Sequence, residues 1–225
     1  MKLYMHPLST ASRPVSLFLA DNNIEVEEKV VDLMTGEHLK PPYSVINPNC
    51  LVPMLEDGDF KLTESSAILK YLAEKIDSPA YPKDLRQRAT VNEMLDWFNT
   101  NFHRNWGYGL IYPQIFPNHK RRTDEAQTAT IEWAKQHSQR WMAVLNDYWI
   151  GPQHQFLCGD RITIADYFGA VLTTVGELIR CDYSAYPNVQ RWCNNVRKQS
   201  AAWATVNNQF YGLCEAVKGQ SFRAI

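Results

Sequence analysis

The chain contains no long hydrophobic run. No window approaches the roughly 18 consecutive apolar residues that a membrane-spanning helix needs, and the apolar stretch 2–6 is too short for the core of a secretory signal and ends at Pro7. We therefore expect a soluble, cytoplasmic protein that has no membrane partner.

The sequence also has no excess of charge of either sign. It carries 23 Lys and Arg against 24 Asp and Glu, a formal net charge of −1 over 225 residues. Proteins that bind nucleic acid through phosphate contacts have a basic excess, so no nucleic-acid partner is expected. Hydrophobic residues at 45% and charged residues at 21% are typical of a folded globular protein and exclude disorder and coiled coils.

Closely paired cysteines are absent as well. The count is odd and no two have the C-x-x-C spacing; the cysteines are Cys50, Cys158, Cys181, Cys193 and Cys214. A disulfide framework or a zinc site is therefore not expected, and no metal is predicted. Because none precedes Cys50, the first turn of the chain has no thiol that could serve as a nucleophile in thiol–disulfide exchange.

Residues 1–76 alternate between strand and helix patterns. In chain order they predict a strand over 2–6, a helix over 12–22, a strand over 24–30, an irregular stretch over 36–49, hairpin strands over 52–56 and 60–63, and a helix over 64–76. Asp57-Gly58-Asp59 between two apolar runs indicates a tight hairpin turn. This order predicts a thioredoxin-like α/β domain over residues 1–78, with helices packed on a small mixed sheet.

Strand patterns end after this domain. Residues 79–84 contain Tyr81-Pro82 and predict a linker. Beyond it, helical periodicity predicts helices over 85–106, 124–150 and 163–179, with one or two more over 187–213. We therefore expect an all-helical second domain, a helical bundle over residues 85–225.

The turn between the first predicted strand and helix, 8–13, carries three hydroxyls. A strand-to-helix turn presents free N–H groups and the positive end of a helix dipole, which stabilise an anion or a thiolate. A serine hydroxyl that donates to the sulfur adds to this stabilisation. Ser9 is the candidate donor, while Thr10 is close and Ser12 is suited to cap the helix.

Two further segments predict a site for a peptide-like ligand. A cis Val52-Pro53 bond, which costs only about 0.5–1 kcal/mol over trans, would turn the N–H and C=O of Val52 outward for pairing with an extended ligand. Ser65 begins a helix, where a carboxylate binds favourably, and Glu64 offers a negative charge to an ammonium group. Together the pair would hold an amino-acid head group.

A fourth motif predicts structure and not chemistry. In Thr163-Ile164-Ala165-Asp166, the threonine and the aspartate can form a capping box at the start of a helix. Ile162 before it and Tyr167 after it are placed for a hydrophobic staple.

With these motifs in place, the chain resembles a cytosolic glutathione S-transferase of the theta-like serine type. The matching residues are Leu3-Tyr4, Leu8-Ser9 and Arg13; Asp32-Leu33 with Gly36-Glu37-His38-Leu39; Asn47-Pro48 with Val52-Pro53; Asp57-Gly58-Asp59-Phe60; Leu62-Thr63-Glu64-Ser65 with Ala67-Ile68-Leu69 and Tyr71-Leu72; and Gly159-Asp160 with Ile164-Ala165-Asp166. Each motif alone is unspecific, whereas their order and spacing together are specific and span nearly the whole chain.

The resemblance implies glutathione as co-substrate and a role for each matching position. Ser9 would donate to the glutathione sulfur, Val52 would pair with the cysteinyl backbone beside cis-Pro53, Glu64 and Ser65 would hold the γ-glutamyl group, and His38 would reach the glycine carboxylate. Leu51 departs from the pattern, because theta-like proteins often carry a basic residue there. We therefore expect glutathione to bind more weakly, or its binding to depend on His38.

Other residues compete for these roles. Tyrosine-type transferases use a tyrosine of the first strand, but Tyr4 is too early in this chain and Pro7 occupies the expected region. Arg13 is expected to make a structural or interface pair and not a direct contact with the sulfur. The electrophile pocket is predicted from Leu8, His103, Arg104 and Trp106, although a helix rich in tryptophan and phenylalanine also fits the core.

The leading hypothesis is thus an enzyme that conjugates glutathione to small, mostly hydrophobic electrophiles, as in detoxification. The resemblance also implies a homodimer. Two alternatives stay open from the sequence: a non-catalytic interaction module of the same fold, and a glutathione-dependent peroxidase or disulfide reductase that uses the same site.

Overall fold

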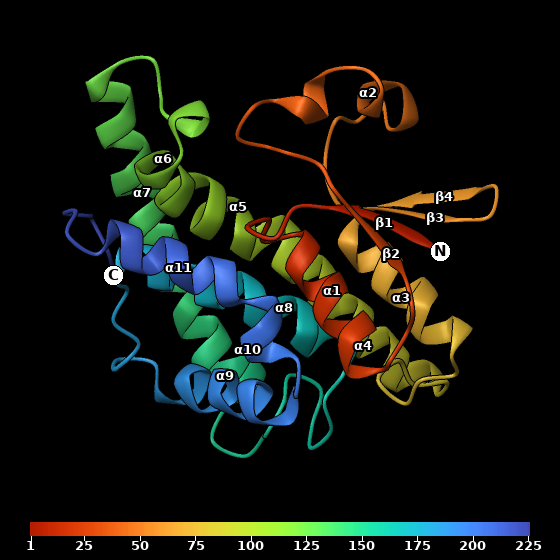
Figure 1. The fold of residues 1–225 in the computed structure, drawn as a ribbon. Helices are drawn as coiled ribbons and strands as arrows, with labels where there is room; N and C mark the ends of the chain where they lie inside the picture. Colours follow the sequence, from red (N-terminus) through yellow and green to blue (C-terminus); the bar gives the residue numbers. More distant parts are fainter.

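The computed structural model describes all residues, 1–225, as a small sheet domain beside a larger helical domain (Figure 1). One sheet contains β1 (Lys2–Met5), β2 (Glu27–Val30), β3 (Met54–Asp57) and β4 (Phe60–Thr63), in the order β2-β1-β3-β4. β1 and β2 are parallel, and the other two pairs are antiparallel. The predicted α/β fold with its mixed sheet is confirmed.

The hairpin between β3 and β4 turns where the sequence predicts. Asp57 pairs with Phe60, which leaves Gly58 and Asp59 as the loop. Gly58 has a φ of +65°, a left-handed conformation that glycine adopts without steric cost. At the opposite edge, all four residues of β2 are exposed, and its charged side chains suit an unpaired sheet edge.

Helices α1 (Ser12–Asp21) and α3 (Ser65–Lys75) contact each other beside the sheet. Apolar residues of both are buried, among them Val15, Phe18 and Leu69. The connection between β2 and β3 contains only a short 3-10 turn, Glu37–Leu39, and α2 (Tyr43–Ile46), and it stands away from the helical domain in Figure 1. These elements agree with the predicted helices and the predicted irregular stretch.

The helical domain begins with a longer helical column than the sequence predicts. It runs as α4 (Leu85–Trp97), a π-helical turn at Phe98–Phe102, α5 (His103–Asn105), a second π-helical turn at Trp106–Ile111 and α6 (Tyr112–Ile115). The π-helical turns change which residues share a face, because each full turn holds more residues than in an α-helix. This shift decides which side chains face the sheet domain.

The remaining helices follow the predicted order. They are α7 (Asp124–Val144), extended by a π-helical turn at Leu145–Ile150, α8 (Ile164–Thr174) with a 3-10 turn at Val175–Ile179, α9 (Pro187–Gln199), α10 (Trp203–Val206) and α11 (Asn208–Val217). The predicted capping box is present at the start of α8. Buried Asp166 accepts from the Thr163 N–H at 2.7 Å and from Trp192 Nε1 at 2.8 Å.

The two domains share one hydrophobic core. A cluster of 46 buried residues contains side chains of the sheet domain and of the helical domain. Phe18 of α1 packs edge-to-face on Tyr167 of α8, with ring centroids 5.4 Å apart. Buried Arg13 donates from Nη1 to Asn207 Oδ1 at 2.7 Å. This packing fixes the walls of any cavity between the domains.

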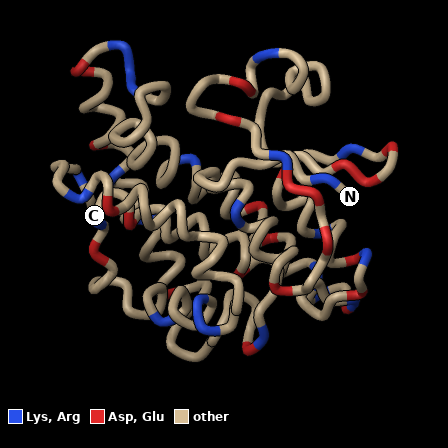
Figure 2. Tube along the Cα trace, in the orientation of Figure 1, with Lys and Arg blue, Asp and Glu red and all other residues tan.

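The C-terminal segment is held against the helical domain. The Arg180 guanidinium donates to the carbonyls of Lys218 and Gln220, and the Ile225 carbonyl accepts from the Asp182 N–H at 2.8 Å. Acidic and basic residues are interspersed along the trace in Figure 2. None of the helices is long and apolar enough to cross a membrane. The predicted division into a first domain over 1–78, a linker over 79–84 and a second domain over 85–225 stays a prediction.

Candidate active site

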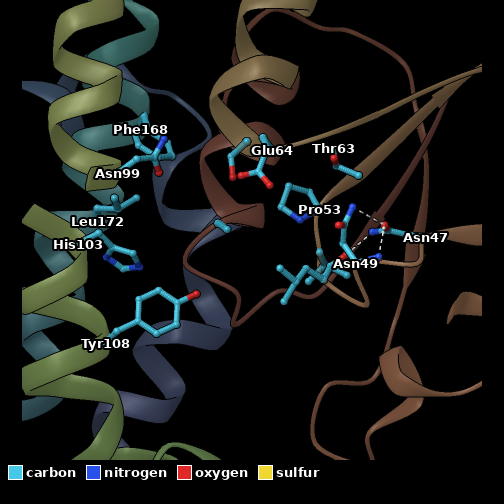
Figure 3. Close-up of a pocket in the computed structure, with 14 residues that line it drawn as sticks. Asn47, Asn49, Pro53, Thr63, Glu64, Asn99, His103, Tyr108, Phe168 and Leu172 are labelled. Carbon is cyan, nitrogen blue, oxygen red and sulfur yellow. Dashed lines mark hydrogen bonds between the residues drawn. The ribbon is translucent and has the colours of Figure 1, made fainter. Parts of the chain in front are cut away.

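A cavity lies between the sheet domain and the α4–α6 column (Figure 3). Its lining combines both domains: Ala11, Asn47, Asn49, Leu51, Val52, Pro53, Thr63, Glu64 and Ser65 from one, and Asn99, His103, Tyr108, Phe168 and Leu172 from the other. Four of the predicted glutathione-binding residues, Val52, Pro53, Glu64 and Ser65, therefore meet at one place. His103 of the predicted electrophile pocket faces them.

The loop before β3 presents unpaired backbone groups. The Val52–Pro53 peptide bond is cis, as predicted. Neither the N–H nor the C=O of Val52 bonds to another backbone group, although the residue is only 8% exposed. Because buried backbone groups are normally paired, this free pair is available to an extended ligand that adds as a strand.

Buried Asn47 holds this loop in place. Its Nδ2 donates to the Leu51 carbonyl at 2.8 Å, and the Tyr43 hydroxyl donates to the same carbonyl. Its Oδ1 accepts from the backbone N–H of Asn49 at 3.1 Å. These bonds fix the chain immediately before Val52. The sequence offered only the Asn47-Pro48 motif as a signal of this role.

The N-terminus of α3 is open toward the cavity. No side chain caps the helix, so its first N–H groups have no partner within it. Buried Ser65 begins α3, and exposed Glu64 before it has a φ of +66°. A left-handed conformation at a non-glycine residue costs about 1–3 kcal/mol, and such residues cluster at functional sites. The arrangement suits a carboxylate at the helix end and an ammonium at Glu64.

Of the three hydroxyls in the turn after β1, Ser9 is the only one that is not buried. Its Oγ accepts from the Ser12 N–H at 3.1 Å, which leaves the hydroxyl hydrogen free to donate. Ser12 is fully buried, and Thr10 is only 6% exposed. Ser9 itself is half-buried and lies outside the cavity lining, two residues before Ala11, which is part of it.

The structure does not bring the other predicted residues into this lining. The placement of Trp106 in the electrophile pocket is wrong: it is fully buried, and its Nε1 donates to the Thr173 carbonyl at 3.1 Å. Arg104 is exposed and Leu8 half-buried, and neither lines the cavity. His38 also lies outside it, on the Glu37–Leu39 turn, with Nδ1 buried and without a hydrogen-bond partner.

Tyr108, which the sequence interpretation missed, takes a place on the helical wall. An α-helix would put residues 103 and 108 on different faces, whereas the wider π-helical turn brings them together. The only signal in the sequence is the pair of glycines that flank Tyr108. A side chain at Gly107 would clash with the His103 ring, since its Cβ would lie 2.4 Å from Cε1.

The cavity holds little charge. Glu64 is the only acidic residue in its lining, and no Lys or Arg lines it. Burial lowers the pKa of His103 to about 4, so this ring is neutral near neutral pH. Positive potential inside the cavity therefore comes from N–H and O–H dipoles, above all from the end of α3.

Comparison with known protein families matches both domains. Residues 1–74 match the glutathione S-transferase N-terminal domain, and residues 119–200 match the glutathione S-transferase C-terminal domain. The relatives include human glutathione S-transferase theta-1, 37% identical over 204 residues, which covers 87% of this chain and 82% of the human protein. They also include glutathione S-transferase D7 of Drosophila melanogaster, 32% identical over 207 residues, with 90% and 87% covered.

Solved structures give the same result. The crystal structure of human glutathione transferase theta-2 in complex with glutathione superposes with a TM-score of 0.85. The match covers 99% of this chain and 92% of the human chain at 26% identity. The chain is thus similar to these proteins over nearly its whole sequence, and it has the order of domains, the cis-proline loop and the open end of α3 described above. The chain belongs to the glutathione S-transferase family.

Proposed function

We propose that this protein conjugates the thiolate of glutathione to small, mostly hydrophobic electrophiles. One observation carries the proposal: the free backbone of Val52 and the uncapped end of α3 with Glu64 open into the same cavity. These are the groups that an extended γ-glutamyl peptide needs at its backbone, its carboxylate and its ammonium.

Each residue predicted to bind glutathione keeps its role in this proposal. The γ-glutamyl carboxylate binds the first N–H groups of α3 and the Ser65 hydroxyl, and its ammonium binds Glu64. The cysteinyl backbone pairs with Val52 beside Pro53. The Ser9 hydroxyl then donates to the sulfur, and every 1.4 kcal/mol or so of preferential thiolate stabilisation lowers the thiol pKa by about one unit.

The glycine end of glutathione is assigned to His38. Its buried Nδ1 has no partner within the chain, which supports a ligand contact. Leu51, 58% exposed, lines the cavity and offers no charge. Glutathione binding is therefore expected to depend on the γ-glutamyl end more than on the glycine carboxylate.

We propose that two copies of the chain form a homodimer. Exposed apolar side chains support this assembly: Leu85 at the start of α4 is 80% exposed, and Phe60 on β4 is 45% exposed. Sedimentation equilibrium should give twice the chain mass, and Leu85→Asp should reduce it to the chain mass. The cytoplasmic location stays a prediction.

The experiment that tests the function is a binding measurement followed by a panel of acceptors. Titration calorimetry should detect glutathione binding, and transfer should be measured to an aryl halide, an alkyl halide, an epoxide, a hydroperoxide and a mixed disulfide. Conjugation to the carbon electrophiles supports the proposal. Binding without any turnover would indicate an interaction module, and turnover of only the last two acceptors would indicate a peroxidase or a reductase.

A further inference from the structure

The turn between β1 and α1 begins at a histidine that the site described so far does not use. His6 directly follows β1 and is only 7% exposed. Its carbonyl accepts from the Ser9 N–H at 2.9 Å, which closes a β-turn over residues 6–9 with Pro7 in the second position. Proline is favoured there because its ring already fixes the backbone angle that the turn requires. Ser9 therefore stands at the end of a turn that begins at His6.

The His6 side chain closes the same turn a second time. Its Nδ1 accepts from the Leu8 N–H at 3.2 Å. Asparagine and aspartate make the same bond, from the first residue of a turn to the N–H two positions along, through an oxygen on Cγ. Nδ1 of histidine is likewise bonded to Cγ. Since Pro7 has no N–H, the Leu8 group is the first backbone donor that this side chain can reach.

This bond requires a neutral His6 ring. A backbone N–H only donates, so Nδ1 carries no hydrogen and the ring hydrogen lies on Nε2. Burial lowers the pKa of His6, and the negative charge of Asp32 opposes this only in part. At neutral pH the ring is therefore neutral, and Nδ1 accepts the bond that holds the turn.

Helix α1 holds Ser9 from the other side. The Ser9 carbonyl accepts from the N–H groups of Ser12 and Arg13 at 3.1 and 3.0 Å. The fully buried Ser12 hydroxyl accepts in turn from the His6 N–H at 3.4 Å. Ser9 is thus fixed between the His6 turn and the first turn of α1. A hydroxyl that is already held in place stabilises an anion without a cost of reorganisation.

We infer that His6 is a positioning residue, which orients the Ser9 hydroxyl toward the glutathione sulfur through the bond between its Nδ1 and the Leu8 N–H. This inference rests on the role of Ser9 in the proposed function. His6 does not line the cavity, so it acts through the backbone that carries Ser9. Without the bond the turn gains freedom, and small displacements of a catalytic group reduce its effect strongly.

The test compares His6→Leu with His6→Asn, two variants of nearly the same size and shape. Asparagine keeps an acceptor on Cγ, leucine has none, and both lose the rest of the ring. Ultraviolet absorbance of the bound thiolate against pH, measured without any electrophile, gives the pKa of the thiol. We expect His6→Leu to raise this pKa by about one unit, and His6→Asn to keep it within about 0.3 units of the wild-type value.

Kinetics and a double variant show whether His6 acts through Ser9. In His6→Leu, kcat/KM at neutral pH should fall about tenfold, while the Kd of glutathione changes less than about twofold, because Val52 and Glu64 keep their places. In a Ser9→Ala background, His6→Leu should raise the thiol pKa by less than about 0.3 units. A full further rise in that background would overturn the inference.

A spectroscopic measurement on the wild type needs no variant and therefore does not depend on whether His6→Leu folds. Nitrogen NMR should show His6 Nδ1 as an unprotonated ring nitrogen and Nε2 as the protonated one at neutral pH. A proton on Nδ1 would contradict the bond to the Leu8 N–H, and the inference would be wrong.

The remaining outcomes separate the inference from the proposed function. Equal shifts of the thiol pKa in His6→Leu and His6→Asn, or no shift in either, would overturn the inference and leave the proposed function standing. An unchanged thiol pKa in Ser9→Ala would remove Ser9 from the proposed function, and the inference would fall with it. A wild type that binds glutathione but converts no electrophile contradicts the proposed function alone, because the thiol pKa still decides the role of His6.

Discussion

The Tyr112 hydroxyl lies 3.1 Å from Nε2 of His103, on the wall of the cavity that faces the sheet domain. Burial lowers the pKa of His103 to about 4 and raises the pKa of Tyr112, so both groups are neutral at physiological pH.

This burial should make stability depend on pH through His103. Its ordinary pKa is 6.5, and in the folded chain it is about 4. As the pH falls from 6.5 to 4, the unfolded state takes up a proton that the folded state does not, so the free energy of unfolding decreases. The loss approaches about 3 kcal/mol at most.

Urea unfolding of the wild type and His103→Gln between pH 7 and pH 4 measures this contribution. The wild type should lose more stability than the variant over that range, because glutamine does not titrate. His154→Gln, at an exposed position, is the control and should follow the wild type. Parallel curves for the wild type and His103→Gln would show that the buried ring does not contribute.

Ser9→Ala should raise the pKa of the thiol of bound glutathione. A free thiol has a pKa of about 8.5, and loss of one donor to a thiolate costs about 1.5–3 kcal/mol. We expect kcat/KM for conjugation to fall roughly 10- to 100-fold at neutral pH and to recover at alkaline pH, where the thiolate forms without help. Ultraviolet absorbance of the bound thiolate gives its pKa directly.

The control for Ser9→Ala is Ser184→Ala, on an exposed serine of the helical domain. An unchanged pH profile in Ser9→Ala would remove Ser9 from the mechanism. In that case Thr10→Ala would be the next variant to measure, because Thr10 is its neighbour in the same turn.

Asn47→Ala should weaken glutathione binding, although Asn47 has no proposed contact with the reacting sulfur. The variant leaves the Leu51 carbonyl with the Tyr43 hydroxyl as its only side-chain donor and frees the loop before Val52. We expect the KM for glutathione to rise about tenfold, with kcat at saturation changed less, and stability to fall by about 1–3 kcal/mol. Steady-state kinetics and urea unfolding measure the two effects.

Asn194→Ala, on the exposed side of α9, is the control for this variant. A drop in kcat with an unchanged KM would contradict a role in positioning Val52. Equal behaviour of both variants would show that the loop keeps its form without Asn47.

Asn207→Ala should destabilise the contact between the domains. Asn207 Oδ1 accepts the single hydrogen bond of the fully buried Arg13 guanidinium, which also stacks on the Phe210 ring at 4.1 Å. Without it a buried cation loses its partner, and we expect a loss of about 2–4 kcal/mol in the free energy of unfolding. The neighbouring Asn208→Ala, at an exposed position, is the matched control.

A double-mutant cycle with Arg13→Met separates this pair from its surroundings. If Arg13 and Asn207 depend on each other, Asn207→Ala should cost much less stability in the Arg13→Met background than in the wild type. Additive effects would show that the two side chains contribute independently.

The sequence by itself determined the features that depend on residues close together in the chain. The turn at Asp57-Gly58 and the capping box of Thr163 and Asp166 involve neighbours within four positions, so local geometry is enough to predict them. The cis bond at Pro53 and the start of α3 at Ser65 follow from motifs of the same kind. Four residues of the cavity lining, Val52, Pro53, Glu64 and Ser65, were accordingly among those that the sequence singled out.

The tertiary structure alone decided the opposite wall. The sequence interpretation considered Trp106 for the electrophile pocket, with the core as the alternative. The structure buries Trp106 in the core and brings Tyr108, from the π-helical turn, to the cavity. π-helical turns are rare and occur mostly as single turns inside α-helices, and the periodicity of a single sequence does not show where they occur. The bond of Arg13 to Asn207 likewise joins residues 194 positions apart, which only the folded chain brings together.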